Sequence, residues 1–211
     1  MIYEFPRPDE PICQGDIFHY IPRIEFDLGK LPVIEGEKIL NKDWINVSKI
    51  NSPVTILVAA RPVEAIVINQ NCDVVRTNDI ALCEISSMEN VIPYSRDTKT
   101  PKGWMSIITK HSRENLKWFY LPIDSTIHFN NRMAVDFRSV LHASRIYLEK
   151  NLGQLRIGRL NKIAVEHFRE RLSEYFRRYP YDEWYPLNKV EFEEYRKDKD
   201  KGDTKPFPYQ T

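Results

Sequence analysis

Residues 69–73, Asn-Gln-Asn-Cys-Asp, place a thiol and a carboxylate side by side directly after a short apolar run. That run, Ile66–Ile68, is β-branched and predicts a buried strand. A cysteine acts as a nucleophile only as the thiolate, which needs a neighbouring histidine, lysine or helix N-terminus to form readily. The five histidines of the chain all lie far from Cys72 in the sequence. We therefore interpret Cys72 as a small buried hydrophobic residue and Asp73 as a turn cap, a signature of the fold more than an active site.

The cysteines Cys13, Cys72 and Cys83 do not follow a metal-binding spacing, and the sequence has no Cys-x-x-Cys or His-x-x-x-His pair. It also has no Gly-rich phosphate loop and no Gly-x-Ser-x-Gly elbow. We therefore predict no metal and no cofactor. Sparse cysteines, a start without an apolar signal core and the lack of a membrane-length apolar run predict a cytoplasmic protein with no membrane partner.

Basic residues are concentrated in one part of the chain. The whole chain carries a net charge of +1, which excludes a global field for nucleic acid, whereas residues 132–178 hold eleven basic and five acidic residues. Arginine dominates this excess and suits bidentate phosphate contacts. The candidate nucleic-acid ligands are Arg156, Arg159, Lys162, Arg169, Arg177 and Arg178. The alternative is a solvated helix face with intrahelical ion pairs, and the sequence favours neither interpretation.

The elements that position these residues are mostly short strands separated by turns, a pattern typical of a β-barrel. Strands are expected over 14–21, 54–60, 64–69, 80–85, 117–122 and 133–141, with Gly15 in a tight turn and Arg61-Pro62 as a connection. Residues 27–53 form a long excursion with a short hairpin within 31–50. Residues 97–113 interrupt the strands, because Trp104, Ile107, Ile108 and His111 follow a helical spacing and predict a short inserted helix.

From residue 161 the apolar period changes to 3.6, which predicts a helix that Asn161 caps and Pro180 ends. The fold class is therefore α+β: a β-rich, partly open barrel with a short inserted helix and a C-terminal helix packed on it. The expected organisation is a barrel domain over 1–150, a C-terminal helical element over 151–186 and a charged tail over 187–211.

Two motifs of the chain together resemble a known family. Gln14-Gly15-Asp16-Ile17, followed by Arg61-Pro62 and the strand Ala65–Ile68, resembles the start of the MazF/PemK-type toxins. The same Gly-Asp-Ile element with Gln70-Asn71-Cys72-Asp73 is similar to uncharacterised bacterial proteins that carry Ser-Gln-(Ser/Thr)-Cys-Asp and a C-terminal Arg-rich helix. This chain has Asn69 and Asn71 at the Ser and Ser/Thr positions. The resemblance implies an SH3-like barrel.

The toxin resemblance also implies sequence-specific RNA cleavage by an arginine and a polar Ser or Thr. This chain departs from the toxins in the 27–53 excursion, in the added C-terminal helix and in Pro22-Arg23, where the toxins carry a Gly-rich loop. No catalytic threonine can be carried over to a position of this chain. The departures therefore affect the expected nuclease activity more than the expected fold.

Two functions of different classes follow. The first is a non-enzymatic accessory or adaptor subunit of a multi-protein bacterial system, of the anti-phage defence or toxin–antitoxin type. It would bind a larger protein through the 27–53 excursion and the late aromatic residues, and contact nucleic acid through the Arg-rich part. The alternative is a MazF-like endoribonuclease, in which Arg23 or Arg61 stabilises phosphate charge, Asp16 orients groups and Cys72–Asp73 shape the site. We favour the adaptor because no acid–base pair with suitable spacing can be assigned.

Overall fold

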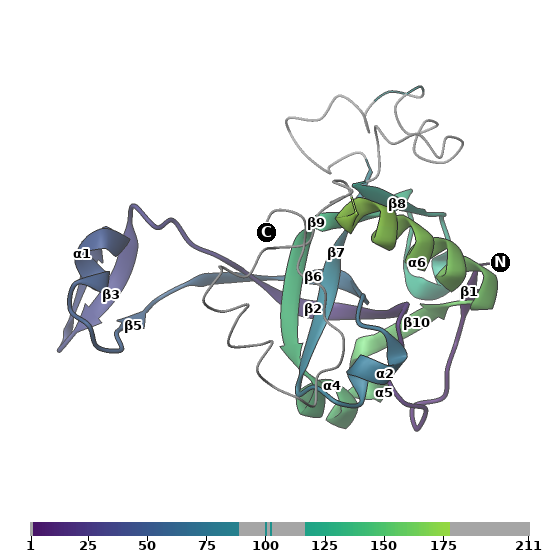
Figure 1. The fold of residues 1–211 in the computed structure, drawn as a ribbon, viewed down its shortest axis with the longest axis horizontal. Coiled ribbons are helices and arrows are strands. Elements are labelled where there is room, and N and C mark those ends of the chain that lie inside the picture. Colours follow the sequence, from purple (N-terminus) through teal and green to yellow (C-terminus); the bar gives the residue numbers. More distant parts are fainter. Residues whose placement is uncertain (1, 89–99, 101, 103–116, 178–211) are drawn as a thin grey trace, which may run out of the picture. The chain divides into compact units, whose positions relative to one another are not determined.

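The computed structural model describes residues 2–88, 100, 102 and 117–177. Its main feature is a curled, half-barrel antiparallel sheet with strand order β1-β10-β2-β6-β7-β9-β8 (Figure 1). The strands are β1 Tyr3–Glu4, β2 Asp16–Glu25, β6 Ala59–Val67, β7 Asp79–Ser87, β8 Trp118–Leu121, β9 Met133–Ser144 and β10 Arg156–Leu160. With a few added helices, the fold is β-rich α+β, as predicted.

Each face of the sheet carries a cluster of buried apolar residues, and successive side chains of a strand point to opposite faces. Ile17 and Phe18 are neighbours in β2, yet they belong to two separate apolar clusters. The first cluster, on the Ile17 face, includes Phe168 of the C-terminal helix α6 (Lys162–Phe176). The second, on the Phe18 face, includes Leu148 and Leu152 of the short helices α4 (Arg145–Lys150) and α5 (Leu152–Leu155).

The C-terminal helix begins as the sequence predicts. The side-chain oxygen of Asn161 accepts a hydrogen bond from the Ala164 amide at 2.9 Å, which satisfies one of the free N–H groups of the first turn. Ala164 and Phe168 are buried on one face, and the Phe168 ring makes an edge contact with Phe119 of β8. This packing holds α6 against the Ile17 face of the sheet.

The excursion predicted over 27–53 contains a hairpin and forms a small sheet of its own. Strands β3 (Leu31–Glu35), β4 (Lys38–Lys42) and β5 (Thr55–Ile56) pair in the order β4-β3-β5, and helix α1 (Trp44–Ser48) lies between β4 and β5 in the chain. Leu31, Val33 and Val47 are its buried residues, with Val54 and Ile56 packed against them. We call residues 27–58 the insert.

The structure differs from the sequence prediction in two elements. Residues 59–67 form one continuous strand, β6, although Arg61-Pro62 was expected to connect two strands. Pro62 fits within β6 because it lies opposite Pro22 in a part of the strand that pairs only with β2. Residues 156–160, expected within a helical element, form β10 between β1 and β2. The predicted helix within 97–113 lies outside the described residues, apart from 100 and 102.

Met1–Tyr175 form one compact unit, so β10 and most of α6 belong with the main sheet. Phe176–Thr211 form a second, of which the structure describes only Phe176 and Arg177. Within the described parts of the chain, no helix is long and apolar enough to cross a membrane.

Gly15 gives a test of the turn that enters β2. Its φ is +89°, and a Cβ built there would lie 3.1 Å from Cγ2 of Val165 in α6. We expect Gly15→Ala to lower the free energy of unfolding by about 1–3 kcal/mol in urea titrations, because it adds backbone strain to a close contact. Gly153→Ala in α5 is the control, because its Cβ would meet only an ordinary 3.9 Å contact with Pro8. Equal free energies of unfolding for the two variants would contradict the strained, closely packed position of Gly15.

Candidate functional site

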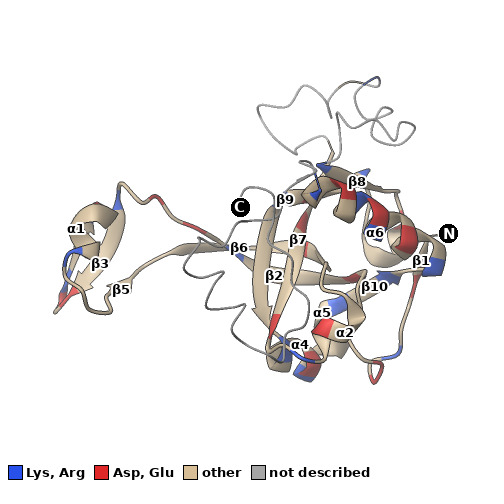
Figure 2. Ribbon diagram, viewed as in Figure 1, with Lys and Arg blue, Asp and Glu red and all other residues tan. Residues whose placement is uncertain are grey.

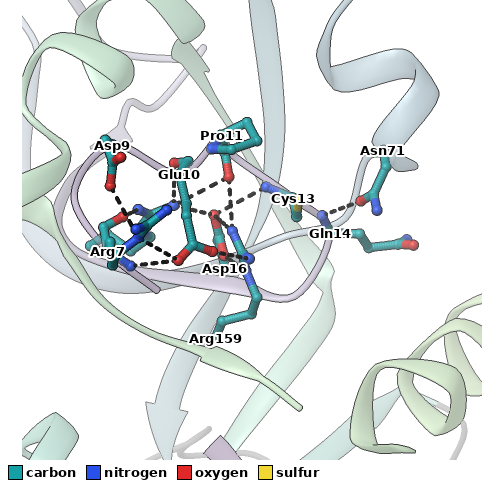
Figure 3. A network of polar contacts seen from close by, with 10 residues as sticks. Arg7, Asp9, Glu10, Pro11, Cys13, Gln14, Asp16, Asn71 and Arg159 are labelled. Carbon is teal, nitrogen blue, oxygen red and sulfur yellow. Dashed lines mark hydrogen bonds and ion pairs between the residues drawn. The ribbon is translucent and has the colours of Figure 1, made fainter. Parts of the chain in front are cut away.

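The carboxylate of Asp16, the first residue of β2, lies at the centre of a buried polar network (Figure 3). Its Oδ2 accepts hydrogen bonds from the Cys13 amide at 3.0 Å and from Arg156 Nη1 at 3.1 Å. Arg159 forms a bidentate pair with the same carboxylate, from Nε to Oδ1 and from Nη2 to Oδ2. Asp16 therefore accepts hydrogen bonds from one backbone amide and from two arginines, and the arginine partners were not foreseen.

The two arginines also fasten the N-terminal segment to the sheet. Arg156 Nη1 donates to the carbonyl of Glu10 at 3.0 Å, and Arg159 Nη2 donates to the carbonyl of Pro11 at 2.8 Å. The Arg156 side chain is only 2% exposed. These guanidinium groups thus neutralise Asp16 and satisfy loop carbonyls. Arg156 and Arg159, predicted as nucleic-acid ligands, are instead used inside the protein.

Gln14 connects the Gly-Asp-Ile turn to the Asn69–Asp73 segment. Its side-chain nitrogen donates to the carbonyl of Ile68 at 2.8 Å, and its amide donates to Oδ1 of Asn71 at 2.8 Å. Its side-chain oxygen accepts a hydrogen bond from Nε of Arg169 in α6 at 2.7 Å. Asn69 Oδ1 in turn accepts from the Ala81 amide of β7. The two sequence motifs therefore meet in space, and their amide side chains join β2, β6, β7 and α6.

Cys72 is exposed, which corrects its interpretation as a small buried hydrophobic residue. It lies in helix α2 (Asn71–Val74), a single turn between β6 and β7, where Val74 is the buried residue. Its sulfur lies 3.8 Å from Oδ1 of Asp73 and 3.9 Å from Oε1 of Gln70. In the described residues, three or more His, Cys, Asp or Glu side chains do not gather as a metal site would require. The thiol thus has polar neighbours and no assigned catalytic partner.

Arg23 and Arg61, the other residues proposed for RNA cleavage, face each other across β2 and β6. Arg23 Nη1 and Arg61 Nη2 bind the two carboxylate oxygens of the buried Glu84 at 2.9 and 2.8 Å. Arg61 also pairs with Glu25 at 3.2 Å. Hydrogen bonding to Glu84 raises the pKa of the Arg61 guanidinium. The cluster is therefore balanced in charge by its own acids.

Asp16 does not join this arginine pair. Arg23 is the seventh residue after Asp16 in β2, which places it about 20 Å away at the usual rise of a strand. Asp16 is enclosed by Arg156 and Arg159, whereas Arg23 and Arg61 share Glu84. The residues named for a ribonuclease site thus fall into two separate networks.

The remaining basic candidates have mixed surroundings. In α6, basic and glutamate residues are interspersed along the helix (Figure 2). Arg169 pairs with Glu166 at 2.7 Å in addition to its bond to Gln14, which matches the alternative of intrahelical pairs. Lys162 and Arg177 are exposed at the two ends of the helix. Arg178 lies outside the described residues.

The sequence predicted that the excursion binds a partner, but it did not predict the apolar surface of the excursion. Of the twenty large hydrophobic residues that are exposed in the described part of the chain, seven lie within 27–53. They are Leu28, Ile34, Ile39, Leu40, Trp44, Ile45 and Ile50. The run Ile39-Leu40 and the pair Trp44-Ile45 were visible signals, because adjacent apolar residues in a short strand or helix cannot all turn inward.

No family model matches the chain, and the comparisons with curated proteins and with solved structures gave no match either.

Substitution of Asp16 tests the buried network. We expect Asp16→Asn to lower the free energy of unfolding by about 3–5 kcal/mol, because it leaves the buried Arg156 charge without its carboxylate. Asp9→Asn is the matched control: Asp9 is exposed and pairs with Arg7 at 3.5 Å, so its effect should be within about 1 kcal/mol. Urea unfolding followed by circular dichroism measures both. A loss at Asp16 no larger than at Asp9 would contradict the central role of this carboxylate.

The three thiols should differ in reactivity. Burial raises the pKa of the Cys83 thiol to about 12, and burial also raises the pKa of Cys13, whereas Cys72 is exposed. Because only the thiolate reacts, we expect iodoacetamide at neutral pH to modify Cys72 first and Cys83 only after unfolding. Mass spectrometry of the labelled peptides at successive times gives the order. Modification of native Cys83 as fast as Cys72 would contradict its burial.

Proposed function

We propose that the protein is a non-enzymatic adaptor subunit that binds a larger protein through its insert. The observation that carries this proposal is the concentration of exposed large apolar side chains on residues 27–53. Single exposed hydrophobic residues are common on protein surfaces, but a contiguous group of them indicates an interaction site. Trp44, which is 45% exposed, supplies an aromatic side chain of the kind enriched in binding hot spots.

The small core of the insert supports the same conclusion. Only Leu31, Val33 and Val47 are buried in it, with Val54 and Ile56 partly covered. Small folding units bury too little apolar surface to be stable without additional contacts. Ile39, Leu40 and Ile45 would supply such contacts when a partner protein covers them. More large apolar side chains of the insert are exposed than are buried in its core.

The other parts of the proposal rest on the resemblance and the composition. The similarity to the Gly-Asp-Ile proteins supports an SH3-like barrel as the scaffold and a multi-protein bacterial system as the setting, of the anti-phage or toxin–antitoxin type. The sparse, free cysteines support a cytoplasmic location. The ribonuclease alternative has less support, because Asp16 and the Arg23–Arg61 pair lie in separate networks. Nucleic-acid contact through Lys162 and Arg177 remains part of the proposal as a secondary role.

Affinity purification from the native host tests the adaptor. A tagged full-length chain should co-purify one larger protein in stoichiometric amount, as measured by quantitative mass spectrometry. Trp44→Ala and Ile45→Asp should each reduce the recovered partner by about tenfold or more, because truncating a hot-spot residue costs ~2 kcal/mol. Ile163→Asp is the control, since Ile163 is an equally exposed isoleucine on α6.

An RNA-cleavage assay tests the alternative with the same purified protein. Incubation with mixed cellular RNA should leave the RNA intact. Cleavage that is lost in Arg61→Ala would contradict the non-enzymatic proposal. Arg61 is the better probe than Asp16, because it is half exposed and Asp16 substitution is expected to destabilise the fold.

A further inference from the structure

Strands β2 and β6 continue beyond the main sheet as a two-stranded ribbon that leads into the insert (Figure 1). Residues 21–25 pair with residues 59–63, while β10 reaches only Asp16–Phe18 of β2 and β7 reaches only Glu64–Val67 of β6. Among the described strands, this part of the ribbon therefore has no third member. A two-stranded antiparallel unit is marginally stable in water unless one of its faces is covered.

One face of the ribbon carries charged residues that form ion pairs within the chain. Ile21 and Val63 are paired and buried in the cluster on the Phe18 face. Two residues further along each strand, Arg23 and Arg61 lie on the same face and bind Glu84. The charged residues of this face are therefore paired with Glu84 of the main sheet.

Over residues 22–26 and 58–62 the opposite face carries only apolar residues, and the half-buried Glu64 is the next residue of β6 on this side. Pro22 is paired with Pro62, and Ile24 is paired with Ala60; all four are exposed, and Ile24 is 52% exposed. Phe26 and Val58 continue the alternation just beyond the paired residues and are exposed as well. We call these six residues the ribbon face. A face without a charged side chain, on a unit that needs a covering layer, indicates an interface.

The edges of the ribbon cannot supply that covering layer. Proline has no N–H group, and in an antiparallel pair each residue directs its N–H either to its partner or outward. The prolines of the Pro22–Pro62 pair remove a donor from both outer edges at the same level. Addition of a further strand is disfavoured at this point. Any occupant must therefore cover the face instead of extending the sheet.

We propose that the occupant is a second copy of this chain, so that two ribbon faces pack against each other in a symmetric dimer. Ile24, Phe26 and Val58 are 40–58% exposed and the other three residues are also exposed, so the six offer on the order of 500 Å² per copy, given ~150–250 Å² for a large aromatic side chain and less for the others. Two such faces together bury about 1,000 Å², which is below the ~1,200–2,000 Å² of stable specific interfaces and within the range of weak ones. The area therefore fits a weak, concentration-dependent dimer.

The composition of the face fits a two-fold contact. In a two-fold interface the same patch meets itself, so a single charge near the axis would be opposed by its own copy. The ribbon face has no such charge. Its central cross-strand pair joins a large residue, Ile24, to a small one, Ala60, so each Ile24 can pack over the Ala60 of the other copy. This inference is independent of the proposed adaptor function, which uses α1 and β4 of the insert.

Sedimentation velocity of the purified full-length chain, from low to several hundred micromolar, tests the dimer. We expect the weight-average mass to rise from that of a monomer toward that of a dimer with increasing concentration. Ile24→Asp and Ala60→Asp should each abolish the rise, because they place two like charges at the centre of the interface. Ile146→Asp is the matched control, since Ile146 is an exposed isoleucine on α4 and its variant should dimerise normally.

Cross-linking locates the contact independently of stability. In a Cys72→Ser background, a thiol-specific bismaleimide cross-linker should join two copies of the Ile24→Cys variant, whereas it should not join two copies of Ile146→Cys. Circular dichroism of each variant establishes that the fold is retained. A monomer at all concentrations, or a dimer that persists in both ribbon variants, would overturn the inference. Neither outcome would affect the adaptor, whose partner depends on Trp44 and Ile45.

Discussion

The burial of the Asp16 carboxylate is the interaction on which the rest of the main sheet depends. A buried charge is costly unless it is paired and hydrogen-bonded, and Asp16 has a backbone amide and two arginines as partners. Arg156 and Arg159 both belong to β10, and Asp16 begins β2, so the ion pairs fix the neighbouring strands at this level. The same two arginines hold the carbonyls of the N-terminal segment. One carboxylate therefore joins the N-terminal segment and β2 to β10, which lies about 140 residues further along the chain.

The sequence was most informative where local rules decide the structure. The turn at Gly15, the strand over 80–85, the hairpin after residue 30 and the Asn161 cap all depend on residues close to one another. The partners of Asp16 could not be predicted in this way, because 140 residues separate it from Arg156. A count of basic residues cannot distinguish an arginine that faces solvent from one that faces a buried carboxylate. Strand β10 was missed for a related reason: it is five residues long and its pairing with β2 is non-local.

The polar residues around Cys72 form a structural junction and not a reactive site, and their partners are also remote in sequence. Asn69 and Asn71 stand beside a cysteine in the sequence, yet their side-chain oxygens accept hydrogen bonds from the backbone amides of Ala81 and Gln14. Amide side chains that replace missing ladder bonds at strand ends stabilise a fold and leave few groups for chemistry. The exposed thiol of Cys72 lies on the outside of this junction. The resemblance in the two motifs thus concerns residues that hold strands together, and function is better sought on surfaces that lack internal partners.

A single backbone irregularity determines which surface the ribbon presents. Between the pairs Phe18–Ala65 and Ile21–Val63, β2 has one more residue than β6, and Tyr20 within this bulge adopts a φ of +59°. Such a conformation costs on the order of 1–3 kcal/mol for a non-glycine residue.

The bulge places Ile21 on the same buried face of the sheet as Phe18, and it places Arg23 beside Glu84. The ring of His19 donates to the carbonyl of Gln154 and ties the bulge to α5. If all residues of β2 paired with β6 without this bulge, Pro22 would lie opposite Arg61 and Arg23 would lie on the other face. The bulge therefore separates a charged, internally paired face from an apolar one, and this separation gives the ribbon a surface that only an apolar partner can cover.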